Sequence, residues 1–319
     1  MPLEKKRAFS ARYILFFMTT LSLVCALILS LLAQALNKPQ QQAKELYRSR
    51  QLLLAARILS YEGSFLLADE TKSKWGFARY DNTQNILVPT TRPVPATNRA
   101  ILALFQNRIH ARLVDDQGQL LTFQQAGIDQ SDYIAAHAAT GYAALPYKLI
   151  YLILPNQPPT ELQQSSTPIG YVIPINGYGL WDAIYGYLGL SAEGATILGM
   201  TWYDQKETPG LGGEIGLPDW QRQFQGKKIF QHKPTKVFNP TRAPLGIQII
   251  RGGVQNARLT PEQEETAVDG IAGASITMTG VSNALKSCLQ PYRPFLVKVY
   301  REKPQGAFHD KTPSAMECF

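Results

Sequence analysis

The 319-residue sequence predicts an α+β protein in which one N-terminal transmembrane helix precedes an extracytoplasmic mixed α/β domain. Three observations support this fold class. Residues 13–36 form an uncharged apolar run. After residue 166, strand-like and helix-like segments are mixed without regular βαβ alternation. Only 18% of the residues are charged although 45% are hydrophobic, which indicates that some apolar residues lie outside an ordinary soluble core.

Charge and cysteine content exclude several functions. The net charge is +8, but Lys5, Lys6, Arg7 and Arg12 against Glu4 give 4 − 1 = +3 within the first twelve residues. The remaining excess is interspersed with acids, so the sequence does not predict a nucleic-acid-binding face. Three cysteines without zinc-ligand spacing predict neither a metal site nor a disulfide scaffold.

The N-terminal segment predicts a retained membrane anchor. Residues 13–36 read YILFFMTTLSLVCALILSLLAQAL, and about 20 apolar residues suffice for a helix to cross a bilayer. The sequence Ala33-Gln34-Ala35 leaves a cleaved signal peptide as the alternative, although the apolar part of such peptides usually has only about 7 to 15 residues. The basic cluster before the span places residues 1–12 in the cytoplasm and the bulk of the chain in the periplasm of a bacterium. Cys288 and Cys318 could form a disulfide there.

The exported part divides at a Pro-, Gln- and Ser-rich stretch at 155–168. Before it, residues 37–165 predict a helical and variable region that serves for packing or as a spacer. After it, residues 166–319 predict the domain with the chemistry. The expected helices are 41–59 and 279–289, and a short helix with a turn is expected within 219–230. A turn is expected at 176–179, and strands or apolar segments are expected at 148–154, 169–175, 183–190, 195–203 and 246–250.

Two glycine-rich segments form the candidate site. Neither is a phosphate loop or a dinucleotide fingerprint. Residues 207–214, ETPGLGGE, require a tight loop, and residues 269–280 place small and hydroxyl residues before a helix. Trp181, Trp202 and Tyr203 flank the glycine-rich turns at 176–179 and 207–214, a composition that suits a flat aromatic ligand beside exposed amides. The ordinary alternative is a surface turn and a helix cap.

Four segments follow the anchor in a fixed order: GLWDAIYGYLGL, GMTWYDQKETPGLGGEI, PDWQRQFQGKKIF and residues 269–280. This order resembles the C subunit of the sodium-translocating NADH:quinone reductase, well over residues 170–300 and loosely over the anchor. The resemblance implies an electron-transfer flavoprotein subunit of a sodium-transporting NADH:ubiquinone reductase, a translocase of the bacterial inner membrane. Two alternatives stay open: the FMN subunit of the related ferredoxin-linked (Rnf-type) complex, and a membrane-anchored assembly module without redox function.

The resemblance also implies an FMN-binding domain whose FMN is covalently attached through a phosphoester. The family motif S-G-A-T corresponds here to Ala272-Gly273-Ala274-Ser275, which points to Ser275 as the attachment residue and leaves Thr277 as the alternative. No residue beyond the flavin is expected to be catalytic. The implied partners are other subunits of a membrane respiratory complex and, during maturation, a flavin transferase. The residues expected to contact the cofactor are Gly177, Trp181, Glu207, Thr208, Gly210, Leu211, Gly212, Arg251, Asp269, Gly273, Ala274 and Thr277.

Overall fold

The structure is a computed structural model that describes residues 10–69, 74–158, 167–231 and 238–302. The chain divides into two compact units, Met1–Arg48 and Ser49–Phe319. Cys318, a candidate disulfide partner, lies outside the described residues. Its candidate partner Cys288 is buried, and its thiol donates to the backbone oxygen of Asn176 at 3.2 Å.

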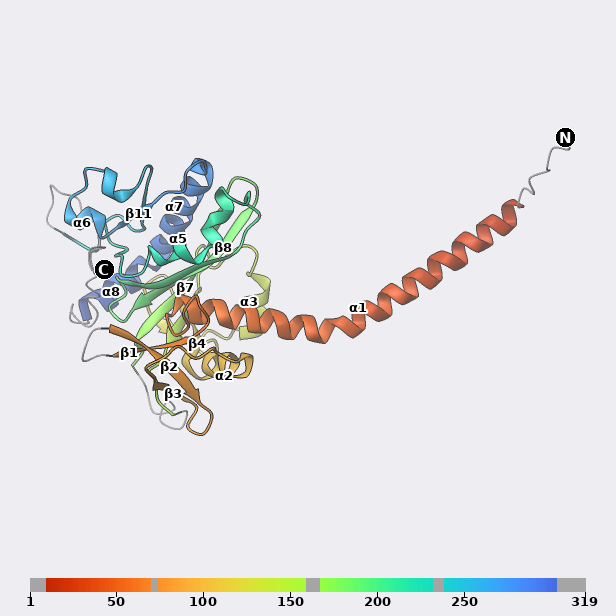
Figure 1. Cartoon of the computed structure of the whole chain (residues 1–319), viewed down its shortest axis with the longest axis horizontal. Coiled ribbons are helices and arrows are strands. Elements are labelled where there is room, and N and C mark those ends of the chain that lie inside the picture. The colour runs from red at the N-terminus through yellow and green to blue at the C-terminus, as the bar shows by residue number, and fades with distance from the viewer. Residues whose placement is uncertain (1–9, 70–73, 159–166, 232–237, 303–319) are drawn as a thin grey trace. The chain divides into compact units, whose positions relative to one another are not determined.

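Helix α1, Ala11–Ala55, contains the predicted anchor and most of the helix predicted after it (Figure 1). Its most apolar 18 residues have a mean hydropathy of 2.5, so it is long and apolar enough to cross a membrane. At about 1.5 Å per residue, its 45 residues extend about 68 Å, more than twice the hydrocarbon thickness. Pro39, which has no backbone N–H to donate, lies inside the helix just beyond the predicted span.

An antiparallel sheet of six strands organises the Ser49–Phe319 unit, in the order β5-β4-β6-β7-β8-β9. The strands β7, β8 and β9 are buried along most of their length, because both faces of the sheet are covered. The bounds are β4 (Ile109–Val114), β5 (Leu120–Leu121), β6 (Lys148–Ile153), β7 (Gly170–Tyr178), β8 (Ala183–Ser191) and β9 (Ile197–Asp204).

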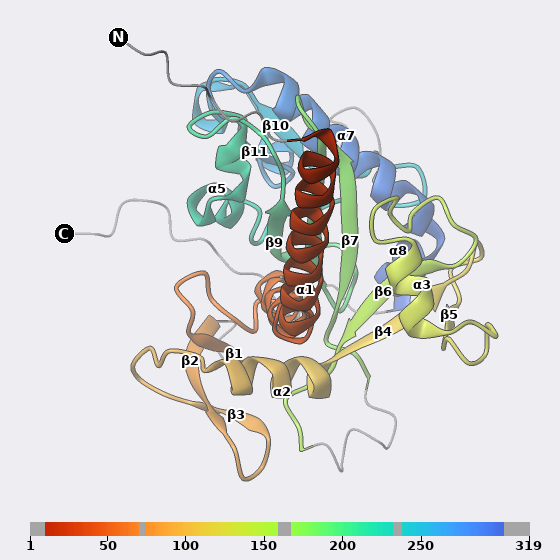
Figure 2. The same cartoon turned by 90° about the vertical axis from the view of Figure 1, so that its right-hand side faces the viewer.

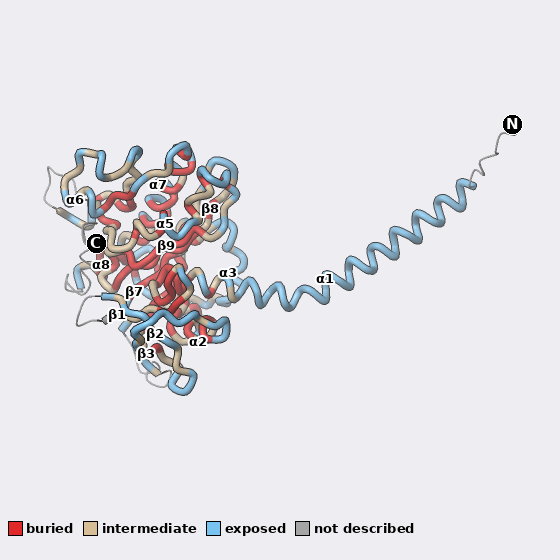
Figure 3. Tube along the Cα trace, viewed as in Figure 1, coloured by how far each residue is buried: buried red, intermediate tan, exposed pale blue. Residues whose placement is uncertain are grey.

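One face of this sheet packs against the C-terminal helices α7 (Ser275–Leu289) and α8 (Arg293–Glu302). Gly177 of β7 lacks the Cβ that would lie only 2.5 Å from the Cβ of Ala284 in α7. The ring of Tyr171 meets the ring of Phe295 in α8 edge-on, with centroids 5.0 Å apart. Figure 3 shows that the buried residues gather in the strands and in the elements that cover them.

The other face of the sheet packs against the last turn of α1. Residues that pair across two strands point to the same face, so Ile184, which pairs with Gly177, faces α7. Side chains alternate between faces along a strand, so Gly189, five residues after Ile184, points to the opposite face. A Cβ on Gly189 would lie 1.8 Å from the carbonyl oxygen of Ala55. Gly199 of β9 pairs with Gly189, and a Cβ on Gly199 would lie 2.7 Å from the carbonyl oxygen of Leu54. The backbones therefore touch because both strands have glycine there.

Smaller elements surround the sheet. A three-stranded antiparallel sheet, β1-β2-β3, lies beside α2 (Figure 2). Asn156, which follows β6, accepts from the N–H of Leu87 in β3 through Oδ1 and donates to the carbonyl oxygen of Leu87 through Nδ2. A two-stranded parallel sheet, β10-β11, precedes α7. The bounds are β1 (Phe65–Asp69), β2 (Lys74–Asp81), β3 (Ile86–Pro89), α2 (Asn98–Arg108), α3 (Gln130–Ala136), η1 (Gly212–Gly216), α5 (Pro218–Arg222), β10 (Gln248–Ile250), η2 (Val254–Asn256), α6 (Pro261–Glu264), β11 (Ala267–Asp269) and η3 (Gln290–Tyr292).

Most predicted segments are confirmed, and some boundaries were wrong. β7 continues to Tyr178, so the chain turns at 179–182 and not at 176–179. The short helix and turn predicted at 219–230 are confirmed, since α5 ends at Arg222 and a turn follows it. Helix α7 begins at Ser275, four residues before the predicted start, because small residues and hydroxyls in its first turn hide the apolar pattern. The stretch 155–168 connects β6 to β7, which pair in one sheet; the division into two exported domains stays a prediction.

Candidate functional site

Three segments that are far apart in the sequence meet at one end of α7: the turn 179–182, the loop 205–214 and the first turns of the helix itself. Glycines permit these approaches. A Cβ on Gly280 of α7 would lie 2.1 Å from the carbonyl oxygen of Tyr178, and one on Gly179 would lie 2.4 Å from Oε1 of Glu207. Any side chain at either position would separate the segments.

Glu207 connects the three segments through hydrogen bonds, although its side chain is only 5% exposed. Its Oε1 accepts from the backbone N–H groups of Leu180 and Trp181, both at 2.9 Å, and its Oε2 accepts from the hydroxyl of Thr277. Burial by itself would raise the pKa of this carboxyl, but these hydrogen bonds outweigh it and hold the pKa below the ordinary value. The structure thus gives Glu207 hydrogen bonds within the protein, and its predicted contact with a cofactor stays a prediction.

The glycines of the 207–214 loop have different roles. The carbonyl oxygen of Thr208 accepts from the N–H groups of Leu211 and Gly213, at 3.1 and 2.9 Å, which closes the loop. Gly210 has φ +75°, a backbone conformation that residues other than glycine rarely adopt. Gly212 is needed for space, since a Cβ there would lie 2.4 Å from Oγ1 of Thr277.

The two candidate hydroxyls have opposite environments. Ser275 is exposed at the first position of α7, whereas Thr277 is 2% exposed and donates to Glu207. Ala274 caps the helix without a side-chain hydrogen bond, so no side chain at the cap position satisfies the first N–H groups at the positive end of α7. Such an end favours a negatively charged group. Of the two residues, Ser275 is exposed to solvent and Thr277 is buried.

Exposed apolar side chains lie on the same three segments. Leu180 and Trp181 in the turn are 47% and 68% exposed, Leu211 in the loop is 42% exposed, and Ile276 beside Ser275 is 59% exposed. A Cβ on Gly273 would lie 2.8 Å from Cδ2 of Leu211, so the loop packs directly on the segment before α7. Large exposed apolar groups gathered at one site indicate a surface that binds something.

Trp181 is oriented by the protein although it is exposed. Its indole Nε1 donates to Oγ1 of Thr208 at 3.1 Å, and its backbone N–H is held by Glu207. Trp202, which the sequence analysis grouped with it, is only 2% exposed and belongs to the hydrophobic core. Tyr203 stacks on Tyr187, with ring centroids 4.9 Å apart. The expectation that Trp202 holds a ligand was therefore wrong, since its strand position points it inward.

Asp269 ends β11 and pairs with Ile250 of β10, and Arg251 follows Ile250 in the next turn. Among the described residues, no hydrogen bond or ion pair links Asp269 or Arg251 to Ser275. The carboxylate of Asp269 accepts from the N–H of Val254 at 2.6 Å, which fixes the turn after β10. Arg251 lies exposed in that turn, and its guanidinium makes no hydrogen bond or ion pair with the described residues. Gly177 packs against Ala284, as described above. Their roles toward a cofactor stay predictions.

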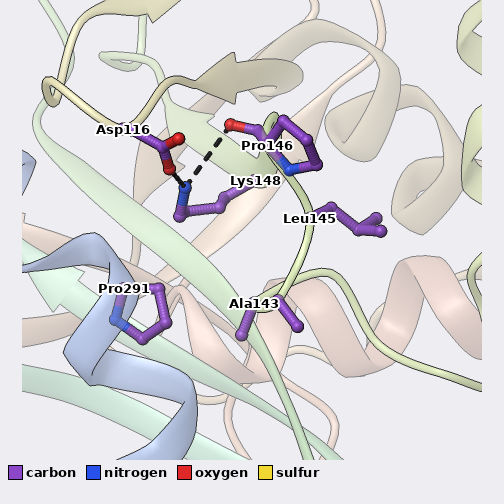
Figure 4. A pocket seen from close by; sticks show the side chains of 7 residues that line it. Asp116, Ala143, Leu145, Pro146, Lys148 and Pro291 are labelled. Carbon is purple, nitrogen blue, oxygen red and sulfur yellow. Dashed lines mark hydrogen bonds and ion pairs between the residues drawn. The ribbon is translucent and has the colours of Figure 1, made fainter.

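A cavity of 340 Å³ lies elsewhere in the domain (Figure 4), and none of the predicted cofactor residues lines it. Nζ of Lys148, a buried side chain, lies 2.5 Å from Oδ1 of the exposed Asp116. The ion pair accounts for the buried cation and attaches the turn after β4 to β6. The cavity is lined by Asp116, Ala143, Ala144, Leu145, Pro146, Lys148 and Pro291.

Comparison with known proteins agrees with this site. Residues 179–290 match the family model described as "FMN-binding domain", and that range contains the turn, the loop and α7. The chain is 35% identical over 306 residues to the C subunit of the Na(+)-translocating NADH-quinone reductase of Chlamydia muridarum, a match that covers 93% of this chain and 95% of that protein. The chain belongs to this C-subunit family.

Other members agree with the assignment. The C subunit of Vibrio campbellii is 33% identical over 222 residues, 65% of this chain and 77% of that protein. The crystal structure of the family member from Parabacteroides distasonis superposes with a TM-score of 0.50 at 21% identity, covering 82% of this chain and 96% of that chain. This likeness confirms the mixed α and β fold.

The sequence analysis missed Leu180 and Ile276 as exposed apolar residues of the site. For Ile276 a signal existed: once the helix starts at 275, this residue falls off the buried stripe formed by Met278, Val281 and Leu285. For Leu180 the only signal was its place between a glycine and a tryptophan in a turn.

Proposed function

We propose that this chain is the FMN-carrying C subunit of a sodium-translocating NADH:quinone reductase and relays electrons within that membrane complex. The observation that carries the proposal is the exposed Ser275 hydroxyl at the open, positive end of α7, with exposed apolar side chains on the same three segments. The names of the relatives favour this complex over the ferredoxin-linked one.

The site suits both ends of an FMN molecule. The open N–H groups of the first turn of α7 would bind the phosphate, and no acidic side chain lies in that turn to repel it. Trp181, Leu211 and Ile276 offer apolar surface to the isoalloxazine ring. When bound, the flavin supplies the redox chemistry, and this chain supplies its position and surroundings.

The proposal includes a covalent bond between the FMN phosphate and Ser275. In this reaction, Oγ of Ser275 attacks the phosphorus of the FMN half of FAD, the bond to the AMP half breaks, and AMP leaves. The serine proton passes to a base of the separate flavin transferase, so atoms and charge balance. A phosphoester makes cofactor retention independent of affinity, which matters outside the cytoplasm, where a dissociated flavin is diluted.

The simplest test is the colour of the denatured chain. The full-length chain, produced together with a flavin transferase, is separated by denaturing gel electrophoresis and viewed under ultraviolet light. We expect a fluorescent band at the mass of the chain, because a phosphoester survives denaturation. A band without fluorescence, although the transferase labels a known acceptor in the same cells, would favour the assembly module without redox function.

The proposal also places the chain after the anchor outside the cytoplasm, on the periplasmic side of the inner membrane. Lys5, Lys6, Arg7 and Arg12 precede the span, and basic residues are held in the cytoplasm. Fusions of alkaline phosphatase after residue 60 are expected to be active, and fusions of a cytoplasmic fluorescent reporter at the same position are expected to be inactive. The reverse pattern would refute the orientation, and a mature chain that begins near residue 36 would identify a signal peptide.

A further inference from the structure

Two hydroxyls stand two residues apart at the start of α7, and the protein treats them differently. We propose that Glu207 is a positioning residue that restricts flavin attachment to Ser275, because it holds the Thr277 hydroxyl inside the protein. The inference rests on the proposed function in that it requires covalent attachment of FMN. It goes beyond that function by giving Glu207, 68 positions before Ser275, control over which hydroxyl oxygen reacts.

The Thr277 hydroxyl is already bonded inside the protein. Its hydrogen is donated to Oε2 of Glu207, and its side chain is 2% exposed. To attack phosphorus, a hydroxyl must reach the substrate and release its proton to a base. Glu207 is itself a base within hydrogen-bonding distance of the Thr277 proton, so what it denies Thr277 is access. The hydroxyl is held in a closed space that an incoming phosphorus does not reach while Glu207 is in place.

The backbone of the 207–214 loop closes this space. A Cβ on Gly212 would lie 2.4 Å from Oγ1 of Thr277 and 2.8 Å from Oε2 of Glu207. The loop therefore lies directly over the bonded pair and leaves no room for an incoming phosphate. The same loop carries Glu207, so the carboxylate and its cover are positioned together.

Burying the carboxylate of Glu207 costs folding free energy. A charge taken out of water destabilises a protein unless hydrogen bonds compensate it. Glu207 has such bonds from Leu180, Trp181 and Thr277, all on the segments next to Ser275. An ordinary surface turn has no need of a buried charge. Because its oxygens are occupied, Glu207 does not serve as the base for Ser275 and acts only through position.

The experiment maps the flavin on the full-length chain after reaction with a flavin transferase and FAD. Trypsin releases the peptide 259–286, which contains both candidate hydroxyls, and fragmentation in a mass spectrometer locates the adduct. We expect the wild-type adduct on Ser275 and no adduct in Ser275→Ala, although Thr277 is intact. In Glu207→Ala we expect a measurable part of the adduct on Thr277, and the double variant Glu207→Ala/Ser275→Ala should carry it there alone.

Two variants separate positioning from a general structural role. Glu207→Gln keeps an oxygen for the amides of Leu180 and Trp181 and an NH₂ group that can bond Thr277, so the adduct should return to Ser275 alone. Glu214→Ala removes another carboxylate of the same loop, which accepts from the N–H of Gly210, and should also leave the adduct on Ser275. A purely structural Glu207 would lower the total adduct without moving it.

The outcomes are distinct. An adduct on Thr277 in Ser275→Ala, where Glu207 is intact, would overturn the inference, and so would a folded Glu207→Ala chain labelled on Ser275 alone. If Glu207→Ala does not fold, the Ser275→Ala result decides. A wild-type chain with no adduct under conditions that label a known acceptor would overturn the proposed attachment itself, and the inference with it.

Discussion

Replacing Ser275 with Ala is expected to remove covalent flavin from the chain completely. The side chain is exposed at the first position of α7, so the change removes the reactive oxygen with little effect on packing. The measurement is the mass of the peptide 259–286 together with the fluorescence of the denatured band. In membranes that contain the whole complex, NADH-dependent quinone reduction should fall to background, because the electron relay lacks a cofactor.

Two companion variants make this result specific. Ser275→Thr keeps the hydroxyl and adds one methyl group at an exposed position, so the adduct should remain. Thr277→Ala removes the buried hydroxyl that donates to Glu207 and should leave the adduct on Ser275 while weakening the loop contact. An adduct that persists in Ser275→Ala, or is lost only in Thr277→Ala, would contradict the assignment of the attachment residue.

Replacing Gly280 with Val is expected to destabilise the domain by about 3 kcal/mol, the upper part of the usual range for overpacking. A Cβ there would lie 2.1 Å from the carbonyl oxygen and 3.1 Å from the carbonyl carbon of Tyr178, and neither backbone atom can move without shifting β7. The valine would push α7 away from the turn that carries Trp181. We therefore expect a lower urea midpoint and, in the folded fraction, less flavin attached to an unchanged Ser275.

The matched control is Gly76→Val in β2. No atom lies within 4 Å of a Cβ at that position, and valine suits a strand, so the free energy of unfolding should change by less than about 0.5 kcal/mol. Both variants should be compared in the full-length chain in the same detergent. A wild-type midpoint for Gly280→Val would mean that α7 does not contact the end of β7 as described.

Local sequence patterns predicted the apolar helix, the family and the candidate site residues. The uncharged run 13–36 predicted an apolar helix, and the structure has one over Ala11–Ala55. The order of the glycine-rich and tryptophan-containing segments indicated the family, which the relatives confirm. The same segments supplied the candidate residues, including the hydroxyl of Ser275. These are properties of neighbouring residues, and a sequence displays them directly.

Other features depend on which side chains are buried, and burial is decided by contacts between distant segments. Trp181 and Trp202 are equally aromatic in the sequence, yet β9 turns Trp202 into the core and the turn leaves Trp181 exposed. Asp269 is an acid next to a glycine-rich stretch, and only the fold shows that it bonds the turn after β10. Composition by itself could not separate these cases.

The sequence by itself determined the apolar N-terminal helix, the family and the short list of hydroxyls at the start of α7. Only the tertiary structure shows that those hydroxyls have opposite environments. The reason is the hydrogen bond between Glu207 and Thr277, which joins residues 70 positions apart and exists only because the glycine loop and the helix pack together. Ser275, two residues earlier on the same helix, lies outside that contact and stays open to solvent.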